Sequence, residues 1–225
     1  MRYRHQTIEF GDFDIHVRTL RDTNEFADVG GEAEALGIPP ASWPLFGVLW
    51  ESAFVLAALM VRADIAGRCI LEVGCGIGLA SLVLNERGAD ITASDRHPEA
   101  ARFLAHNTQL NDAPPIPFER SDWDDHQDGL PRFDLVIGSD LLYEAQHAAL
   151  LAGFIDAHAT PDAEVIVVDA GRGHAGRFAR QMIERGFEHT HRHAANDPSL
   201  AFGREIGARI QIHTFRRGPA PDVGN

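Results

Sequence analysis

The sequence predicts an α/β fold in which helices cover both faces of one mainly parallel β-sheet. From residue 68 onward, short apolar runs alternate with stretches whose apolar residues recur at helical spacing, which is typical of strands joined by crossover helices. A glycine-rich turn follows the first apolar run, at residues 74–78. The chain has 225 residues, of which 44% are hydrophobic, and this is enough for one domain with a substantial core.

The N-terminal part has a different pattern. Residues 7–18 alternate apolar and polar side chains on both sides of Gly11-Asp12, which predicts a β-hairpin. Residues 19–42 are polar and acidic and contain glycine and proline, so we expect a loop or lid there. We therefore divide the chain into three parts, which are an N-terminal hairpin and lid-like extension (1–42), a main domain (43–217) and a disordered tail (218–225).

The main domain is predicted to begin with a helix over 44–63, because Pro44 suits a first turn and apolar residues recur every three or four positions. Apolar runs predict strands at residues 69–73, 90–94, 116–120, 133–139, 164–169, 187–193 and 208–215. Amphipathic spacing predicts helices at residues 79–87, 98–110, 144–159 and 176–185. No helix of comparable strength separates the last two strands, so we expect them to end the sheet as an antiparallel hairpin.

The charge and the basic residues exclude several kinds of chemistry. The 33 acidic and 20 basic residues give a net charge of −13, which does not favour a nucleic-acid partner. All the basic residues are arginine, so mechanisms that need a catalytic lysine, a Schiff base or a P-loop lysine are excluded.

The most apolar window, 45–61, carries Glu51 and is short for a membrane span. With only two cysteines, we expect a cytoplasmic protein that does not bind membranes.

The strongest motif joins the first strand of the main domain to the helix that follows. It reads Glu72-Val-Gly74-Cys-Gly76-Ile-Gly78. Glycine at these positions permits a tight turn and lets the backbone approach a ligand at the helix N-terminus. The second strand ends at Asp95, and a carboxylate at this distance from the glycines suits a ribose diol as its hydrogen-bond partner.

Two classes of cofactor compete for this turn. A dinucleotide site has the spacing G-x-G-x-x-G and directs a diphosphate toward the helix dipole. Here the third glycine comes one position early, and the acidic residue Glu72 closes the first strand. A carboxylate attracts an ammonium or a sulfonium and repels a diphosphate. The motif therefore indicates S-adenosylmethionine, and it disfavours a nicotinamide-dependent oxidoreductase.

These residues resemble the first two motifs of class I (seven-β-strand) methyltransferases. Three further pieces are similar to family-16 methyltransferases, namely Ser42-Trp43-Pro44, Asp122-Trp123 and Ser139-Asp140-Leu-Leu-Tyr143. That group includes protein-lysine methyltransferases and is close to the nicotinamide N-methyltransferase type. The resemblance extends over residues 40–215 and implies a Rossmann-like sheet of seven strands that binds S-adenosylmethionine.

The resemblance also implies the cofactor-binding residues, which are Trp43, Glu72, Gly74, Gly76, Gly78, Asp95, Arg96, Asp122, Trp123 and Ser139. The glycines are implied to leave room for the methionine moiety, and Asp95 to hold the ribose hydroxyls. Arg96 is implied to lie beside the adenine. Asp122 is implied to accept a hydrogen bond from the adenine amino group. Trp123 either packs on the base or fills the edge of the core from a surface loop. Trp43 either closes the pocket or packs where the chain enters the first helix.

Asp140 and Tyr143 are the candidate catalytic residues. They follow the fourth strand of the main domain, at the end where open α/β sheets bind their ligands. A carboxylate and an aromatic face can hold a cationic amine before it loses its proton, so we predict that Asp140 binds the acceptor nitrogen and Tyr143 forms a wall. A second interpretation makes Asp140 the N-cap of the next helix. Arg172, after the fifth strand, either meets an acidic substrate group or lies in solvent.

The histidines at positions 189, 191 and 193 share one face of a predicted strand. Without a neighbouring cysteine or carboxylate motif they indicate a solvated surface, and we predict no metal site.

The predicted function is methyl transfer from S-adenosylmethionine to a nitrogen nucleophile, with a protein lysine as the favoured acceptor. An acidic surface suits a basic protein segment. Two alternatives stay open. The acceptor could be a small-molecule amine, because 225 residues leave little room for a separate docking module, or the protein could bind a nucleotide or cofactor without turnover.

Overall fold

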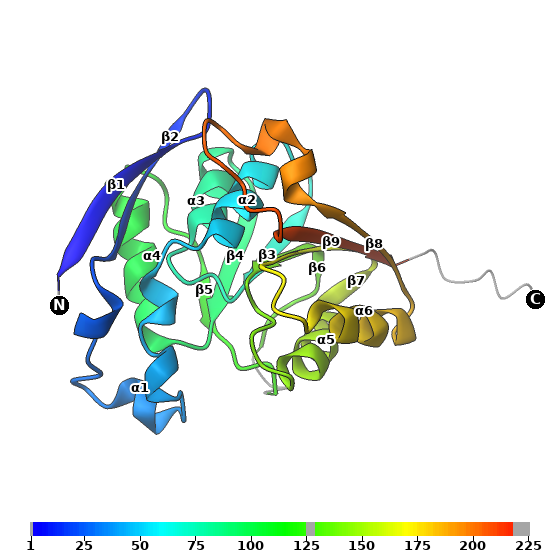
Figure 1. Ribbon diagram of the computed structural model, residues 1–225, viewed down its shortest axis with the longest axis horizontal. Coiled ribbons are helices and arrows are strands. Elements are labelled where there is room, and N and C mark those ends of the chain that lie inside the picture. Colours follow the sequence, from blue (N-terminus) through cyan, green and yellow to red (C-terminus); the bar gives the residue numbers. More distant parts are fainter. Residues whose placement is uncertain (1, 125–128, 218–225) are drawn as a thin grey trace, which may run out of the picture.

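The computed structural model describes residues 2–124 and 129–217 and has the predicted α/β fold (Figure 1). Within those residues, one sheet contains seven strands in the order β5-β4-β3-β6-β7-β9-β8. Its strands are β3 (Cys69–Val73), β4 (Asp90–Asp95), β5 (Phe118–Arg120), β6 (Phe133–Ser139), β7 (Ala159–Asp169), β8 (Phe187–His193) and β9 (Gln211–Arg217). The tail predicted at 218–225 lies outside the described residues.

The first five strands of this order run parallel, and the last two pairings are antiparallel. The expected antiparallel hairpin of β8 and β9 is confirmed, with His191 opposite His213. Strand β9 inserts between β7 and β8, so the last strand of the chain is not at the edge of the sheet. The mainly parallel sheet with an antiparallel C-terminal strand is therefore confirmed.

Helices form one layer on each face of the sheet (Figure 1). Helices α2 (Glu51–Met60), α3 (Leu79–Glu86) and α4 (Pro98–Leu110) cover one face, and α5 (His147–His158) and α6 (Ala175–Glu184) cover the other. The short helix α1 (Glu32–Ala35) belongs to the N-terminal extension and lies outside these layers. Because side chains alternate along a strand, β3 contributes Ile70 to one hydrophobic core and Leu71 to the other. The first core contains residues of α2 and α3, and the second contains residues of α5 and α6.

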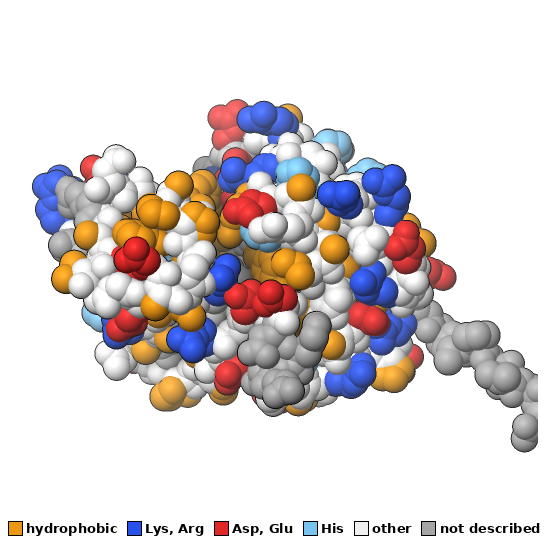
Figure 2. Space-filling model, turned by 90° about the horizontal axis from the view of Figure 1, so that it is seen from below, with side chains coloured by type: hydrophobic (Ala, Val, Ile, Leu, Met, Phe, Trp, Pro, Cys, Tyr) orange, Lys and Arg blue, Asp and Glu red, His pale blue; other side chains and the backbone are white. Residues whose placement is uncertain are grey.

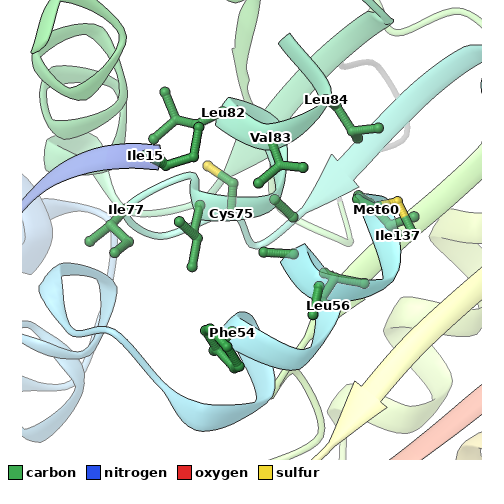
Figure 3. Packing of buried hydrophobic residues seen from close by; sticks show 14 of the residues in the cluster. Ile15, Phe54, Leu56, Met60, Cys75, Ile77, Leu82, Val83, Leu84 and Ile137 are labelled. Carbon is green, nitrogen blue, oxygen red and sulfur yellow. The ribbon is translucent and has the colours of Figure 1, made fainter. Parts of the chain in front are cut away.

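The N-terminal hairpin consists of β1 (Tyr3–Glu9) and β2 (Asp14–Leu20), as the alternating pattern predicts. Its apolar side chains belong to the first core, where Figure 3 shows Ile15 beside Leu82 and Cys75. Helix α4 also holds the free edge of β2, because the side chain of Asn107 accepts a hydrogen bond from the backbone N–H of Arg18 at 2.8 Å. The extension and the main domain therefore share one core.

The predicted helix over 44–63 is wrong in its first part. A 3-10 turn at Leu45–Gly47 comes first, Val48 is extended, and α2 begins only at Glu51. The turn before α2 requires glycine at position 47, because a Cβ there would lie 2.5 Å from the side chain of Leu20. Other boundaries shift less: the helix predicted from 144 begins at His147.

The apolar segment Pro40–Met60 has the length and composition of a membrane span. Half of its most apolar window is nevertheless buried within the fold, and α2 packs in the first core. Its apolar character is explained by this packing.

Candidate active site

A cavity of about 800 Å³ lies at the carboxyl ends of β3, β4 and β6. This volume is within the roughly 300–1,000 Å³ that is usual for small-molecule sites. Figure 2 shows a hollow on this side of the molecule, with acidic, basic and hydrophobic side chains around its rim. The cavity also receives residues from the break before α2 and from the start of α5. Open α/β sheets bind their ligands at this edge, outside the carboxyl ends of the parallel strands.

The glycine turn forms one wall of the cavity. Gly74 and Gly76 have positive φ angles of 61° and 54°, which side-chain-bearing residues rarely adopt. A Cβ on Gly76 would lie 2.8 Å from the carbonyl oxygen of Phe46, and one on Gly74 would lie 2.5 Å from Leu141. Gly78 packs against Leu104 and does not line the cavity. Leu141 and Phe46 thus occupy the space that a side chain at 74 or 76 would need, so the turn requires glycine at both positions.

Asp95 connects this turn to the next helix. Its Oδ2 accepts a hydrogen bond from the Gly76 amide at 2.9 Å, and its Oδ1 accepts one from the His97 amide at 2.7 Å. Burial raises the pKa of the Asp95 carboxyl. Because a carboxylate offers about four lone-pair positions, Asp95 can still accept hydrogen bonds from a ligand in the cavity it lines.

Glu72 lies behind the turn and is not among the residues that line the cavity. Its side chain is only 3% exposed and accepts hydrogen bonds from the backbone N–H of Ser81 at 2.9 Å and from the Ser81 hydroxyl. Burial raises the pKa of Glu72 to about 7. In this position, Glu72 connects the end of β3 to the first turn of α3 through Ser81, on the side of the glycine turn away from the cavity.

Arg96 and Asp122 both line the cavity and bind each other. Arg96 Nε lies 2.8 Å from Asp122 Oδ2, and Arg96 Nη2 donates to the carbonyl oxygen of Leu36 in the N-terminal extension. One guanidinium therefore joins the end of β4, the loop after β5 and the extension. Trp123, the neighbour of Asp122, also lines the cavity and packs edge-on against His147.

Of the tryptophans before α2, Trp50 lines the cavity and Trp43 does not. The indole N–H of Trp43 donates to the Ile38 carbonyl at 2.8 Å, and that of Trp50 donates to the Leu45 carbonyl at 3.0 Å. The sequence motif selected Trp43 and missed Trp50. Trp50 reaches the cavity because the chain is extended before α2, and the predicted continuous helix hid that geometry.

Asp140 follows β6 and has a positive φ of 55°. Its backbone N–H donates to the Val168 carbonyl at 2.9 Å, which fixes this conformation. The interpretation of Asp140 as a helix cap is wrong, because α5 begins at His147 and its N-cap residue is Gln146. Arg172 binds both oxygens of the Asp140 carboxylate, so its guanidinium already has an acidic partner within the protein.

Tyr143 and His147 form an aromatic wall of the cavity beside Asp140. Their rings meet edge to face with centroids 4.5 Å apart, and His147 Nδ1 lies 3.1 Å from the Leu141 carbonyl oxygen. Burial raises the pKa of Tyr143 and lowers the pKa of His147, so both side chains are neutral near pH 7. His147 was not predicted as a site residue, and it enters the cavity at the first residue of α5, four positions after Tyr143.

The histidines of β8 lie away from this cavity. His189 and His191 stack on the same face of the strand, and His189 Nε2 lies 3.0 Å from His213 Nδ1 on β9. His193 instead contacts the Ala208 carbonyl. Among the described residues, no group of three or more histidine, cysteine or acidic side chains could hold a metal ion.

A family model described as lysine methyltransferase matches residues 45–184, more than half of the chain. The chain belongs to this lysine methyltransferase family. The matched region of the chain runs from the 3-10 turn before α2 to the end of α6 and includes every strand whose carboxyl end borders the cavity.

Curated relatives agree with this membership. Protein N-lysine methyltransferase METTL21A of Danio rerio is 34% identical over 48% of this chain and 55% of its own length. The electron transfer flavoprotein beta subunit lysine methyltransferase of Danio rerio is 28% identical over 59% and 54%. Histone-arginine methyltransferase METTL23 of Mus musculus is 28% identical over 44% and 42%. The chain spans about half the length of these curated relatives.

Solved structures show the same fold. The Thermus thermophilus 16S rRNA methyltransferase RsmC, in complex with AdoMet and guanosine, has a TM-score of 0.64 at 16% identity, over 96% of this chain and 51% of that one. Magnesium protoporphyrin IX methyltransferase from Synechocystis, with bound SAM, has a TM-score of 0.57 at 20% identity, over 74% and 78%. The Rossmann-like architecture of the chain is thereby confirmed.

Proposed function

We propose that this protein transfers a methyl group from S-adenosylmethionine to the side-chain nitrogen of a lysine in a protein substrate. The observation that carries the proposal is the cavity-lining glycine turn, in which the Gly76 amide donates to Asp95, at the carboxyl edge of the sheet of a lysine methyltransferase family member. The net charge of −13 supports a basic protein segment as the substrate. The two free cysteines support a cytoplasmic location.

The residues of the cavity fit this cofactor. The backbone of Gly74 and Gly76 lines the cavity and carries no side chain, so a ligand can approach it closely, and Asp95 has acceptor capacity for two ribose hydroxyls. Trp123 offers a flat face for the adenine. When bound, S-adenosylmethionine supplies a methyl group on a positively charged sulfur. In a cavity of about 800 Å³ there is room for such a ligand and for the end of an acceptor side chain.

The residues on the other side of the cavity would handle the acceptor. A lysine reacts only as a neutral amine, so the protein has to orient the nitrogen and allow its proton to leave. The Asp140 carboxylate can accept an N–H of the acceptor, and the neutral Tyr143 ring forms the wall of the approach. The side chain of Asp140 is 9% exposed, which strengthens any hydrogen bond that it makes.

Two measurements test the proposal. Calorimetric titration with S-adenosylmethionine, its demethylated product and NAD identifies the cofactor; we expect binding of the first two, and binding of NAD alone contradicts the proposal. Incubation of the protein with a cell lysate and methyl-labelled S-adenosylmethionine then identifies the acceptor. We expect label on lysine in protein. Label confined to small molecules favours the small-molecule amine, and cofactor binding without label in either fraction favours a protein without turnover.

A further inference from the structure

The ion pair between Asp140 and Arg172 has a specific geometry. Arg172 Nε donates to Asp140 Oδ1 at 3.0 Å, and Arg172 Nη2 donates to Asp140 Oδ2 at 2.9 Å. The guanidinium therefore binds the carboxylate through two parallel hydrogen bonds. A carboxylate recognises a planar guanidinium in this way, because the guanidinium has two N–H donors on one edge. An ammonium lacks such an edge and cannot form this pair of bonds.

An aromatic ring completes the surroundings of this guanidinium. Its central carbon, Cζ, lies 5.7 Å from the ring centroid of Trp50, within the roughly 6 Å of a cation–π contact. The Trp50 indole is itself fixed by its hydrogen bond to the Leu45 carbonyl. All three side chains line the cavity. The carboxylate of Asp140 and the face of Trp50 thus form a subsite for a guanidinium, which we call the Asp140–Trp50 subsite.

The backbone on both sides of the pair is constrained. Asp140 has a positive φ and is held by its hydrogen bond to Val168. Arg172 lies between Gly171 and Gly173, which have φ angles of 75° and 94°. The Gly171 amide donates to Asp169 Oδ2 at 2.7 Å, and a Cβ on Gly171 would lie 3.1 Å from the Arg209 carbonyl oxygen. The loop after β7 is therefore shaped to bring Arg172 to Asp140.

We propose that Arg172 determines the specificity of the acceptor site by filling the Asp140–Trp50 subsite, so that the side chain of a substrate arginine is excluded and a lysine is admitted. This inference rests on the proposed function. Arg172 uses one lone pair on each oxygen of Asp140, and the remaining lone pairs can accept a single N–H from an amine. A substrate guanidinium would need the same two positions on Asp140 that Arg172 already occupies. It would also be repelled by the positive charge of Arg172.

The test uses methylguanidine and methylammonium as probes, titrated calorimetrically into the full-length protein. We expect Arg172→Ala to bind methylguanidine at least about tenfold more tightly than wild type, because one bidentate hydrogen-bonded ion pair is restored. The gain for methylammonium should be much smaller. The double variant Arg172→Ala/Asp140→Asn should lose the gain, and Arg180→Ala, which removes an exposed arginine of α6, should behave as wild type. Arg172→Gln provides a second opened subsite if Arg172→Ala fails to fold.

Two results would overturn the inference. One is a folded Arg172 variant that binds methylguanidine no better than wild type, or no better than methylammonium. The other is methylarginine in acid hydrolysates of lysate protein labelled by wild type; we expect methylarginine only with the Arg172 variants. Titration of wild type with S-adenosylmethionine is run in parallel. Its failure counts against the proposed function and leaves the result of the methylguanidine titration intact.

Discussion

Arg96 binds Asp122 at 2.8 Å and at the same time donates to the backbone carbonyl of Leu36, 60 residues earlier in the chain. This contact joins the N-terminal extension to the edge of the cavity. Arg96 also donates to one carboxylate oxygen of Asp122, which is the residue that the family resemblance implies as the partner of the adenine amino group. Adenine would therefore meet an aspartate whose orientation is already set by an arginine.

Arg96→Ala should loosen the extension without unfolding the domain. Because both side chains of the Arg96–Asp122 pair are more than a third exposed, the pair itself should contribute about 1 kcal/mol or less to stability. Hydrogen exchange at Gly37 and Ile38 should increase, while the melting temperature changes little. Arg120→Ala, at the exposed end of β5, is the matched control. Unchanged exchange at Gly37 would show that other contacts hold the extension.

Asp95→Ala should weaken S-adenosylmethionine binding by about 10- to 100-fold, because hydrogen bonds to a charged group are each worth roughly 1.5–3 kcal/mol. Calorimetry measures the affinity, and circular dichroism checks the fold. Asp162→Ala removes an exposed carboxylate of β7 and should bind as wild type. Equal affinity for Asp95→Ala and wild type would remove Asp95 from the cofactor site.

Gly76→Ala should reduce both stability and cofactor binding. The added Cβ meets the Phe46 carbonyl at 2.8 Å on a backbone with a φ of 54°, and together these should cost about 1–3 kcal/mol. Gly88→Ala separates the two causes, because Gly88 has a φ of 72° but no atom within 4 Å of its Cβ position. Urea denaturation should show a smaller loss for Gly88→Ala, with cofactor binding unchanged. Similar losses of binding in both variants would contradict the steric explanation.

Glu72 should make stability depend on pH in a definite direction. Its pKa is raised to about 7 in the folded protein, so between its ordinary pKa of 4.5 and about 7 the folded state holds a proton that the unfolded state has released. The stabilisation is complete below pH 4.5 and is lost as the pH rises to about 7. Relative to Glu72→Gln, wild type should lose up to about 1.4 kcal/mol of unfolding free energy per pH unit in that window.

Urea denaturation of both proteins at pH 5, 6 and 7 measures this difference. The comparison with Glu72→Gln cancels the buried histidines, such as His97 and His213, whose lowered pKa values of about 4 act in the opposite direction. A difference that is constant over this range would mean that Glu72 stays ionised when the protein folds.

Asp140→Asn should lower methylation of protein lysine at least about 100-fold while the affinity for S-adenosylmethionine stays the same. Asparagine tolerates the positive φ of Asp140, so the backbone should be preserved. Because α5 starts seven residues later, with Gln146 at its N-cap position, the helix should also be intact, as circular dichroism can verify. Unchanged turnover of the labelled substrate would exclude Asp140 from the acceptor site.

The local pattern of the sequence was enough for much of the fold and part of the site. Strand and helix periodicity identified the order of elements from β3 to β9, and the glycine spacing located the turn between β3 and α3. Asp95, Ser139 and Tyr143 lie in the cavity as placed from the sequence. These features depend on backbone geometry within a few residues, so a single sequence is sufficient to predict them.

The partners of these residues were decided by tertiary structure alone. Arg172 reaches Asp140 across 32 residues, Trp50 enters the cavity through a break that periodicity concealed, and Glu72 lies behind the turn although its charge suggested direct contact with the cofactor. The insertion of β9 between β7 and β8 was equally hidden. Local spacing is enough to show which residues stand at the ends of strands. Which of them touch each other depends on how the packed layers bring distant segments together, and no local spacing contains that information.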